Sequence, residues 1–432
     1  MTWHGSMETY HGPDPCATGR LTRTGGRREI TKGSTRTSYH RIQHHNPPMR
    51  RRFLFLSLLV VTVGCSEHAT DPFAEGHAAI RAALLIDPQN LPRYARVTLP
   101  AYFDAAVLGR EDRTIGAPIS DAGATLGRVL FYERELSRNG TVSCATCHSQ
   151  TVAFGDTARF SRGFDGVRTA AHSMRLVNAR FNENGRFFWD RRAASLEAQT
   201  TQPIQDAGEM GFDAAHGGIV AALARLRERP YYAPLVRMAF GDSVITEDRV
   251  QRALAQYVRS VVSTTSRWDL AAAPVFTLAN PQGSLNGPFP TLTPEENQGK
   301  QLFQGSGCAA CHVPPSFSLN ANSRSNGLDA GETRIFRSPS LKQIGRSRRF
   351  MHDGRFATLE QVVAFYDSGI QAGPALDPRL MEPPPVPGGP PSGIPRRFGF
   401  TTEQRAALVA FLRTLTDETL TADPRFSDPF RR

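Results

Sequence analysis

Apolar residues recur every three or four positions in several stretches of the chain, while the alternation typical of strands is scarce. Such spacing places the apolar side chains on one face of a helix and predicts an amphipathic element. The clearest stretches are His77–Leu85, Ala214–Glu228, Thr246–Ser263 and Thr402–Leu415. The pattern predicts a mainly α fold in which helices alternate with loops.

One short pattern occurs twice. Gly127-Arg-Val-Leu-Phe131 returns as Gly299-Lys-Gln-Leu-Phe303, each time a few residues before a cysteine pair. Both predict an amphipathic helix, and Thr293 followed by Pro294 is a typical start for the second one. The repeat favours two similar domains.

Breaks in the pattern suggest the domain limits. A Pro-, Gly- and Asn-rich segment, residues 275–292, predicts a linker between domains at 116–274 and 293–420. Residues 66–115 form an N-terminal extension, and residues 421–432 a tail. A second Pro/Gly-rich segment, residues 383–398, predicts a surface loop.

The N-terminus has the features of an export signal. Met49 and three arginines precede a 12-residue apolar run, Phe53–Gly64, which is shorter than the roughly 20 residues that span a bilayer. Residues 1–48 are then disordered or precede the true start at Met49; the alternative is a genuine long extension. Gly64-Cys65-Ser66 resembles a lipoprotein box, although Thr62 departs from it. Residues 49–65 thus predict a periplasmic protein, either lipid-anchored through Cys65 or simply cleaved.

Net charge changes little in this picture. The chain carries a formal charge of +11, but residues 1–64 alone hold 10 Lys and Arg against 3 Asp and Glu. The remainder is only mildly basic, so the charge gives no reason to expect nucleic-acid binding.

The cysteines define the chemistry. Outside the export region, where Cys16 and Cys65 lie, the chain has four, in Cys144-Ala-Thr-Cys147-His148 and Cys308-Ala-Ala-Cys311-His312. C-x-x-C-H is the attachment signature of c-type haem, with two thioethers to the haem and the histidine as iron ligand. The alternatives are a zinc site, a redox dithiol or a disulfide, none of which requires a histidine after each pair. The cofactors expected are two covalently bound haems.

With these motifs, the chain resembles the bacterial dihaem cytochrome c peroxidase and MauG superfamily from about residue 117 to residue 417. The other matching motifs are Leu126–Tyr132, Phe188–Ala193, Gln199, Pro203–Gly211, Phe350–Gly354 and Leu415–Asp417. The resemblance implies two cytochrome-c-like haem domains with loop-rich decoration. It also implies that the N-terminal haem reacts with hydrogen peroxide and that the C-terminal haem receives electrons from a small cytochrome or copper protein.

The resemblance also implies three catalytic residues. Glu209 matches the glutamate that moves a proton between the two peroxide oxygens, Gln199 a hydrogen-bond donor at the same site, and Trp189 an aromatic relay between the haems. Taken singly, each has a plainer interpretation: a surface glutamate, a helix-surface glutamine and a buried core tryptophan.

Two departures from the family pattern concern the first haem. Many peroxidases have a histidine that caps the resting iron, and Phe164 stands at that position here. An open distal position is therefore expected, with His172 as the alternative ligand. His172 also replaces a calcium-ligating asparagine, and the remaining calcium ligands would be carbonyls near Ser347 and Arg349, beside Arg348. Calcium binding is therefore in doubt.

A further departure concerns the second haem. Fourteen residues after His352 the peroxidase branch has a methionine ligand, and Tyr366 stands there in this chain. MauG-type proteins use a tyrosine at that position, and a phenolate stabilises ferric iron. Tyr366 is therefore the expected ligand alongside His148 and His312, with Met351 or Met381 as alternatives.

Three functions remain in competition. The first is a peroxidase that reduces hydrogen peroxide to water, for which a homodimer is one assembly to consider. The second is a MauG-like oxidase that acts on a protein or another bulky substrate. The third, a non-enzymatic electron carrier, would not need Glu209 and Gln199.

Overall fold

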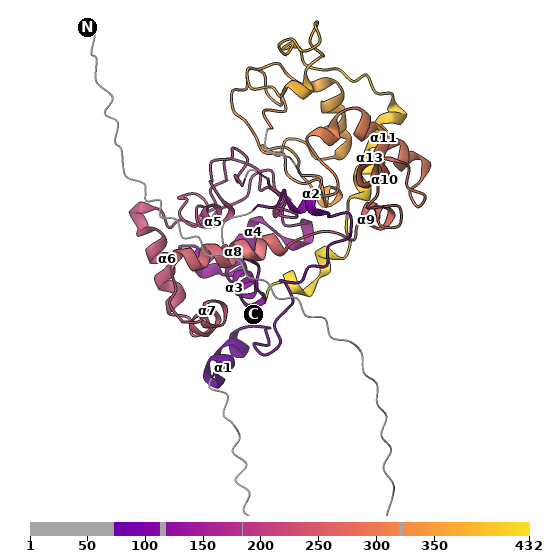
Figure 1. The fold of residues 1–432 in the computed structure, drawn as a ribbon. Coiled ribbons are helices and arrows are strands. Elements are labelled where there is room, and N and C mark those ends of the chain that lie inside the picture. Colours follow the sequence, from indigo (N-terminus) through magenta and orange to yellow (C-terminus); the bar gives the residue numbers. More distant parts are fainter. Residues whose placement is uncertain (1–72, 113–117, 184, 319–322) are drawn as a thin grey trace, which may run out of the picture. The chain divides into compact units, whose positions relative to one another are not determined.

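The computed structural model describes residues 73–112, 118–183, 185–318 and 323–432 (Figure 1). Regular structure within these residues consists of helices, joined by loops that contain only isolated β-bridges, which confirms the mainly α fold. No helix in these ranges has the length and apolarity needed to cross a membrane. The predictions for residues 1–48, for the signal segment 49–65 and for Cys65 fall outside them.

The first of two helix pairs forms the centre of the N-terminal half. Helix α3 (Asp121–Tyr132) packs against α8 (Glu247–Ser260), and they cross at Gly127. A Cβ at Gly127 would overlap the carbonyl oxygen of Ala253. The glycine is therefore required by the close approach of the two backbones.

The second pair repeats this arrangement. Helix α11 (Pro294–Gly305) packs against α13 (Thr402–Thr414), and a Cβ at Gly299 would overlap the carbonyl of Ala407. Thr293 caps α11 by accepting the Glu296 amide, with Pro294 in the first turn, as predicted. Figure 1 shows each pair at the centre of its own group of helices. The sequence repeat is thus a structural repeat.

The other α-helices are shorter and surround the two pairs. They are α1 (Ala74–Ala83), α2 (Ala105–Leu108), α4 (Cys144–Cys147), α5 (Leu196–Thr200), α6 (Gly218–Arg227), α7 (Tyr232–Phe240), α9 (Arg267–Ala272), α10 (Pro281–Asn286) and α12 (Leu359–Ala364). The helix predicted at Ala214–Glu228 is broken: a 3-10 turn ends at Gly217, whose φ is 82°, before α6 begins.

Two hydrophobic cores correspond to the two helix pairs, but the chain crosses between them more often than the sequence pattern indicated. The segment expected to be a linker, residues 275–292, contains α10 and buries Leu285 and Phe289 in the second core. Trp268, placed in the first domain from the sequence, also lies in the second core. Phe426, placed in the tail, lies in the first core. Apolar spacing identifies a buried face without identifying the core that buries it.

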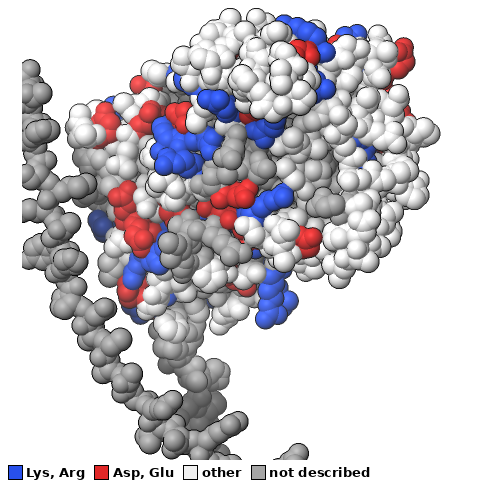
Figure 2. Space-filling model, turned by 45° about the horizontal axis from the view of Figure 1, so that its top comes forward, with Lys and Arg blue, Asp and Glu red and all other residues white. Residues whose placement is uncertain are grey.

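The end of the chain is held to the first helix pair by specific hydrogen bonds. Arg128 donates to the Ser427 carbonyl (Nε···O 2.7 Å), and the Tyr132 hydroxyl donates to the Phe426 carbonyl (2.6 Å). The C-terminus accordingly lies beside α3 and α8 in Figure 1. On the face drawn in Figure 2, Lys and Arg groups are interspersed with Asp and Glu groups.

Candidate functional site

The first cysteine pair lies on one short helix. Helix α4 consists of Cys144–Cys147 itself, and the Ser143 amide donates to the Thr146 hydroxyl (3.0 Å) at its start. His148 follows directly, and its Nδ1 lies 3.0 Å from the Phe154 carbonyl. That hydrogen bond needs the proton on Nδ1, which leaves Nε2 with a lone pair for a metal. Burial lowers the pKa of His148, which favours the neutral ligand form.

The thiols are unbonded and weakly acidic. None of Cys144, Cys147, Cys308 and Cys311 forms a disulfide. Burial raises the pKa of Cys144 to about 12, with further contributions from Cys147 and Glu209. Among the described residues, the one group of three metal-binding side chains is Asp329, Glu332 and His352, which includes no cysteine. The geometry thus fits neither a disulfide nor a zinc site built from the two pairs.

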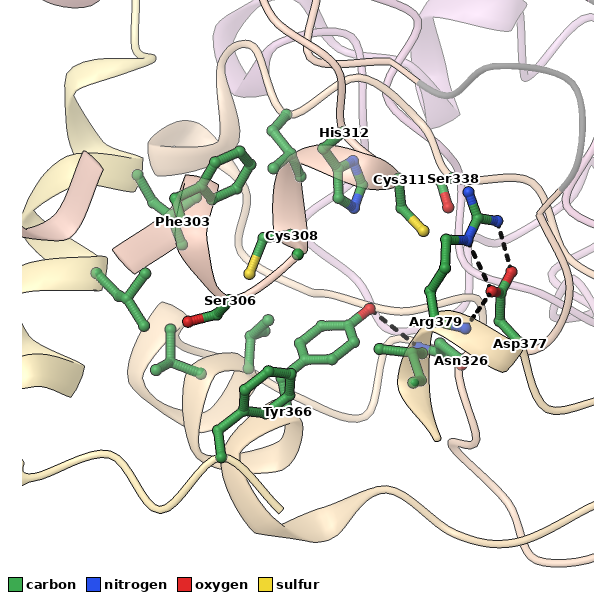
Figure 3. Close-up of a pocket in the computed structure, with 18 of the residues that line it drawn as sticks. Phe303, Ser306, Cys308, Cys311, His312, Asn326, Ser338, Tyr366, Asp377 and Arg379 are labelled. Carbon is green, nitrogen blue, oxygen red and sulfur yellow. Dashed lines mark hydrogen bonds and ion pairs between the residues drawn. The ribbon is translucent and has the colours of Figure 1, made fainter. Parts of the chain in front are cut away.

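The second cysteine pair opens onto a large cavity. Cys308–Ala310 forms a 3-10 turn, and both cysteines line the cavity together with His312 (Figure 3). The rest of the wall is largely apolar, including Phe303, Leu359 and Leu412. A mainly apolar cavity with a few polar groups is typical of a cofactor site.

His312 is the buried base of this second site. Burial is the main cause that lowers its pKa to about 4, and the positive charge of Arg175 lowers it further. The carbonyls of Phe317 and Pro339 oppose this effect, although neither reaches hydrogen-bonding geometry with Nδ1. His312 is therefore neutral, as an iron ligand must be.

Tyr366 faces the same cavity. It belongs to a π-helical turn, Phe365–Gly369, that continues α12, and such turns often occur at functional sites. Figure 3 shows its phenol oxygen pointing into the cavity that contains the two cysteine sulfurs, and Asn326 donates to that oxygen at 3.4 Å. Burial raises the pKa of the phenol to about 12.

Neither alternative methionine lines this cavity. Met351 lines an adjoining one, and its sulfur accepts a hydrogen bond from Asn326 at 3.4 Å. Met381 packs instead in a small apolar cluster with Leu380 and Phe398. Of the three candidate ligands, Tyr366 is the one that lines the cavity with Cys308 and Cys311, whereas Met351 shares only the adjoining cavity with His312.

Glu209 lies close to the first cysteine pair. Its negative charge is among the influences that raise the pKa of both Cys144 and Cys147. The backbone at Glu209 is held by Asp206, whose Oδ1 accepts its amide at 3.0 Å, and by the Phe164 amide. Burial raises the pKa of Glu209, and the charge of Asp206 raises it further, whereas Arg192 lowers it. The site thus has a half-buried carboxylate that binds a proton more readily than an exposed one.

The other two predicted residues lie on different elements. Gln199 is half-buried on α5, two residues after Glu197, which forms a buried ion pair with Arg259. Trp189 follows Phe188, whose φ is 65°, and its ring lies edge-on to His352 with centroids 6.5 Å apart. Trp189 also lines the cavity that adjoins the second cysteine site.

The two residues considered for the distal position differ in their surroundings. Phe164 packs against Gly211 and under the Arg138 guanidinium, and it carries no ligand atom. The His172 ring is held through Nδ1 by the carbonyls of Ala158 (3.1 Å) and Arg159 (3.3 Å).

The segment around Ser347, which was considered for calcium binding, already contacts an arginine of the same chain. The Arg175 guanidinium donates to the Ser347 hydroxyl (2.6 Å) and to the Ser340 carbonyl (3.0 Å). Arg175 and Arg337 were not among the predicted site residues. No signal in the sequence distinguishes them from surface arginines, because their position depends on distant segments.

The group of Asp329, Glu332 and His352 offers little to a metal. Asp329 pairs with Arg355 at 2.7 Å, and Glu332 binds Arg334 through both carboxylate oxygens. The His352 ring stacks on Phe336 with centroids 4.1 Å apart. Both carboxylates are thus neutralised by arginines.

Comparisons with known proteins agree with this geometry. A family model described as di-haem cytochrome c peroxidase matches residues 121–273. A methylamine utilization protein MauG from Methylorubrum extorquens is 31% identical over 317 residues, covering 70% of this chain and 80% of the relative. A cytochrome c551 peroxidase from Nitrosomonas europaea is 29% identical over 259 residues, covering 56% and 71%.

A solved structure extends the match to most of the fold. The crystal structure of a MauG-like protein associated with microbial copper homeostasis superposes with a TM-score of 0.58 at 28% identity. The match covers 79% of this chain and 98% of that protein. The first cysteine site, Cys144–His148, falls within the range that the family model matches.

Proposed function

The chain belongs to the family of di-haem cytochrome c peroxidases and MauG proteins, and from this premise we propose that it reduces hydrogen peroxide to water. It is an oxidoreductase of the cytochrome-c peroxidase type. One c-type haem is attached at Cys144, Cys147 and His148, and a second at Cys308, Cys311 and His312. With both haems bound, the second site would take up electrons and the first would use them. When bound, the haems supply the one-electron redox chemistry that amino-acid side chains lack.

The observation that carries this proposal is the pair of matched sites. Each has two unbonded cysteines followed by a buried, neutral histidine. Beside the first pair lies Glu209, a carboxylate of raised pKa, whereas Asp377, the carboxylate that influences Cys311, has a lowered pKa. This difference supports peroxide chemistry at the first site and electron entry at the second.

Glu209 supplies the proton transfer. Reduction of one peroxide molecule takes up two electrons and two protons and yields two water molecules. Glu209 accepts the proton of the nearer peroxide oxygen and returns it to the departing oxygen, and its raised pKa suits both steps. Gln199 donates a hydrogen bond that orients the peroxide.

The first site is proposed to accept peroxide without prior loss of a ligand. Phe164 offers no ligand atom, and His172 lines the cavity that adjoins the second cysteine site, where the Ala158 and Arg159 carbonyls hold its ring. In the second site Tyr366 would hold the haem iron together with His312, because its oxygen enters the cavity that both cysteines line. A phenolate there stabilises the ferric state.

Electron donor and cellular location follow from the same assignment. A small periplasmic cytochrome or cupredoxin is the proposed donor, and Trp189 the aromatic bridge between the two sites. Export by the segment at residues 49–65 would place the protein in the periplasm, with Cys65 as a lipid anchor.

A second candidate function is a MauG-like oxidase that withdraws electrons from a protein or another bulky substrate. Tyr366 favours it, as does the 31% identity to a MauG protein. The two candidate functions differ in the source of electrons. The test is therefore to add hydrogen peroxide and compare turnover with a reduced small cytochrome and with a protein substrate as the electron donor.

The first experiment is electron paramagnetic resonance with optical spectroscopy on the oxidised protein, before and after peroxide. One high-spin and one low-spin ferric haem, with a rapid change on adding peroxide, is the expected result. Two low-spin haems that do not respond would overturn the proposal of an open site. Loss of turnover in Glu209→Gln then separates an enzyme from an electron carrier.

A further inference from the structure

A second cavity adjoins the one at Cys308 and Cys311, and its wall is strongly basic. Among the described residues, its lining includes four arginines and no aspartate or glutamate: Arg175, Arg324, Arg337 and Arg349. We call this space the arginine chamber. His312, Asn326 and Tyr366 line both cavities, so the chamber is continuous with the second cysteine site.

Two of these arginines are held in place by neutral groups. Arg175 bonds to the Ser347 hydroxyl and the Ser340 carbonyl, and its Nε has no partner. Arg337 points Nη1 at the Met174 sulfur (3.8 Å), with its guanidinium 4.9 Å from the centre of the Phe187 ring. Such contacts fix the direction of a guanidinium and leave its charge uncompensated.

Neither arginine forms an ion pair with a carboxylate of the described residues. Burial lowers the pKa of each to about 10, the direction expected for a cation away from water. Asp112 attracts Arg337, but its carboxylate is already hydrogen-bonded to Arg259 at 2.7 Å. Removing charges from water without charged partners is unfavourable, so an anion in the chamber would stabilise both arginines.

Two of the proposed iron ligands, His312 and Tyr366, line the chamber. Arg175 contributes to the lowered pKa of His312, after the larger effect of burial. Met174, which precedes Arg175 and also lines the chamber, has its carbonyl close enough to the His148 ring to oppose the lowering of that pKa. An anion in the chamber is therefore beside the second cysteine site.

The shape of c-type haem identifies the anion. One edge of the ring is bonded to the two cysteines, and the opposite edge carries two propionate groups. Guanidinium and carboxylate groups match in a planar, two-point hydrogen bond, the strongest form of this pairing. The apolar cavity suits the ring, and the adjoining basic chamber suits its carboxylates.

We propose that the arginine chamber is the carboxylate-binding site of this protein, in which Arg175 and Arg337 hold haem propionates. This inference rests on the proposed attachment of haem at Cys308 and Cys311. Fixed positive charges beside a haem favour its reduced state, because reduction removes one positive charge from the iron. The two arginines thus raise the reduction potential of the haem they hold.

The test compares Arg175→Met and Arg337→Met with Arg175→Lys and Arg337→Lys, which retain the charge. Arg128→Met is the matched control, because Arg128 is a buried arginine bonded to Ser427 and lies outside the chamber lining. Resonance Raman spectroscopy reports the propionate bending modes, and spectroelectrochemistry reports both potentials. Mass spectrometry confirms that two haems are attached to each variant.

We expect the methionine variants to shift the propionate modes and to lower one haem potential. The reduced-to-oxidised ratio should fall at least about tenfold at a fixed potential, equivalent to about 59 mV for one electron. The lysine variants should lower the haem potential less than the methionine variants do. Arg128→Met should change neither the propionate modes nor the potentials. The haem whose potential falls is the one that supplies the propionates.

Unchanged Raman modes and potentials in both methionine variants, at full haem content, would overturn the inference, as would equal changes in Arg128→Met. Neither outcome affects the proposed peroxidase activity. Conversely, a wild-type protein that holds two haems but does not turn over peroxide would refute the proposed function and leave the propionate test valid. Absence of covalent haem in the wild type would refute both.

Discussion

The indole nitrogen of Trp189 donates a hydrogen bond to the backbone carbonyl of His172, with an N···O distance of 2.7 Å. The His172 amide in turn donates to the carbonyl of His352 at 2.8 Å. The indole is therefore held between a segment of the first half of the chain and one of the second. Its orientation is set by backbone groups and does not depend on packing alone.

Replacing Trp189 should slow electron transfer more than it affects folding. We expect Trp189→Phe to lower peroxide turnover at least about tenfold, an increase of about 1.4 kcal/mol in the barrier. The physical reason is the loss of both the larger π system and the hydrogen bond to His172. Stopped-flow measurement of electron transfer between the haems tests this directly.

Trp268→Phe is the matched control for that variant. Trp268 is 1% exposed in the second hydrophobic core, so its replacement should lower the melting temperature and leave turnover per haem intact. Equal losses of turnover in the two variants would show that Trp189 acts only as a packing residue.

Glu209→Gln should remove the proton transfer while preserving the size and hydrogen bonding of the side chain. We expect kcat to fall by about 10²–10⁴-fold, the usual contribution of a general acid–base group. The optical spectra of both haems should stay unchanged, since Glu209 is not an iron ligand in this assignment. A variant that retains full turnover would favour the electron carrier.

Replacing the two charged neighbours of Glu209, Asp206 and Arg192, should shift the pH profile of turnover in opposite directions. Glu209 must be ionised to accept a proton, so turnover falls as the pH decreases through its raised pKa. Asp206→Asn removes a negative charge, which lowers that pKa and moves the acid limb to lower pH. Arg192→Gln removes a positive charge and moves the limb to higher pH.

Steady-state kcat measured against pH for these two variants is the test. Asn at position 206 can still accept the amides of Gly208 and Glu209, so the loop geometry is retained. Shifts in the same direction, or none, would assign the acid limb to a group other than Glu209.

Tyr366 variants should alter the second haem alone. Tyr366→Phe removes the phenol oxygen and should change the optical and electron paramagnetic resonance signals of one haem. Tyr366→Met should raise its potential, because methionine favours ferrous iron more than phenolate does. Met351→Leu and Met381→Leu are the controls, and a ligand change in either would reassign the axial position.

Calcium should have little effect on this protein. The Arg175 guanidinium already binds Ser347, in the segment where calcium ligands were considered, and a fixed cation repels Ca²⁺. Dialysis against a chelator should therefore leave the melting temperature and turnover unchanged. A rise in melting temperature on adding calcium, with one ion bound per chain, would contradict this expectation.

Much of the architecture could be predicted because it depends on residues close in sequence. Helical spacing requires only neighbours within a turn or two, and the cap at Thr293 involves Glu296 three residues later. The C-x-x-C-H motifs are equally local, since each places two thiols and an imidazole on one loop. The repeat that contains Gly127 and Gly299 likewise indicated two similar domains, and the structure added that each glycine lies at a helix crossing.

The sequence by itself determined the helical class, the paired haem motifs and the repeat that relates them. Only the tertiary structure decided which core buries Trp268 and Phe426, and which arginines surround the arginine chamber. These are contacts between residues far apart in the chain, and their energy depends on how all the segments pack together. Neither apolar spacing nor residue type carries that information, because the same arginine is stable at a solvated surface and beside a buried carboxylate.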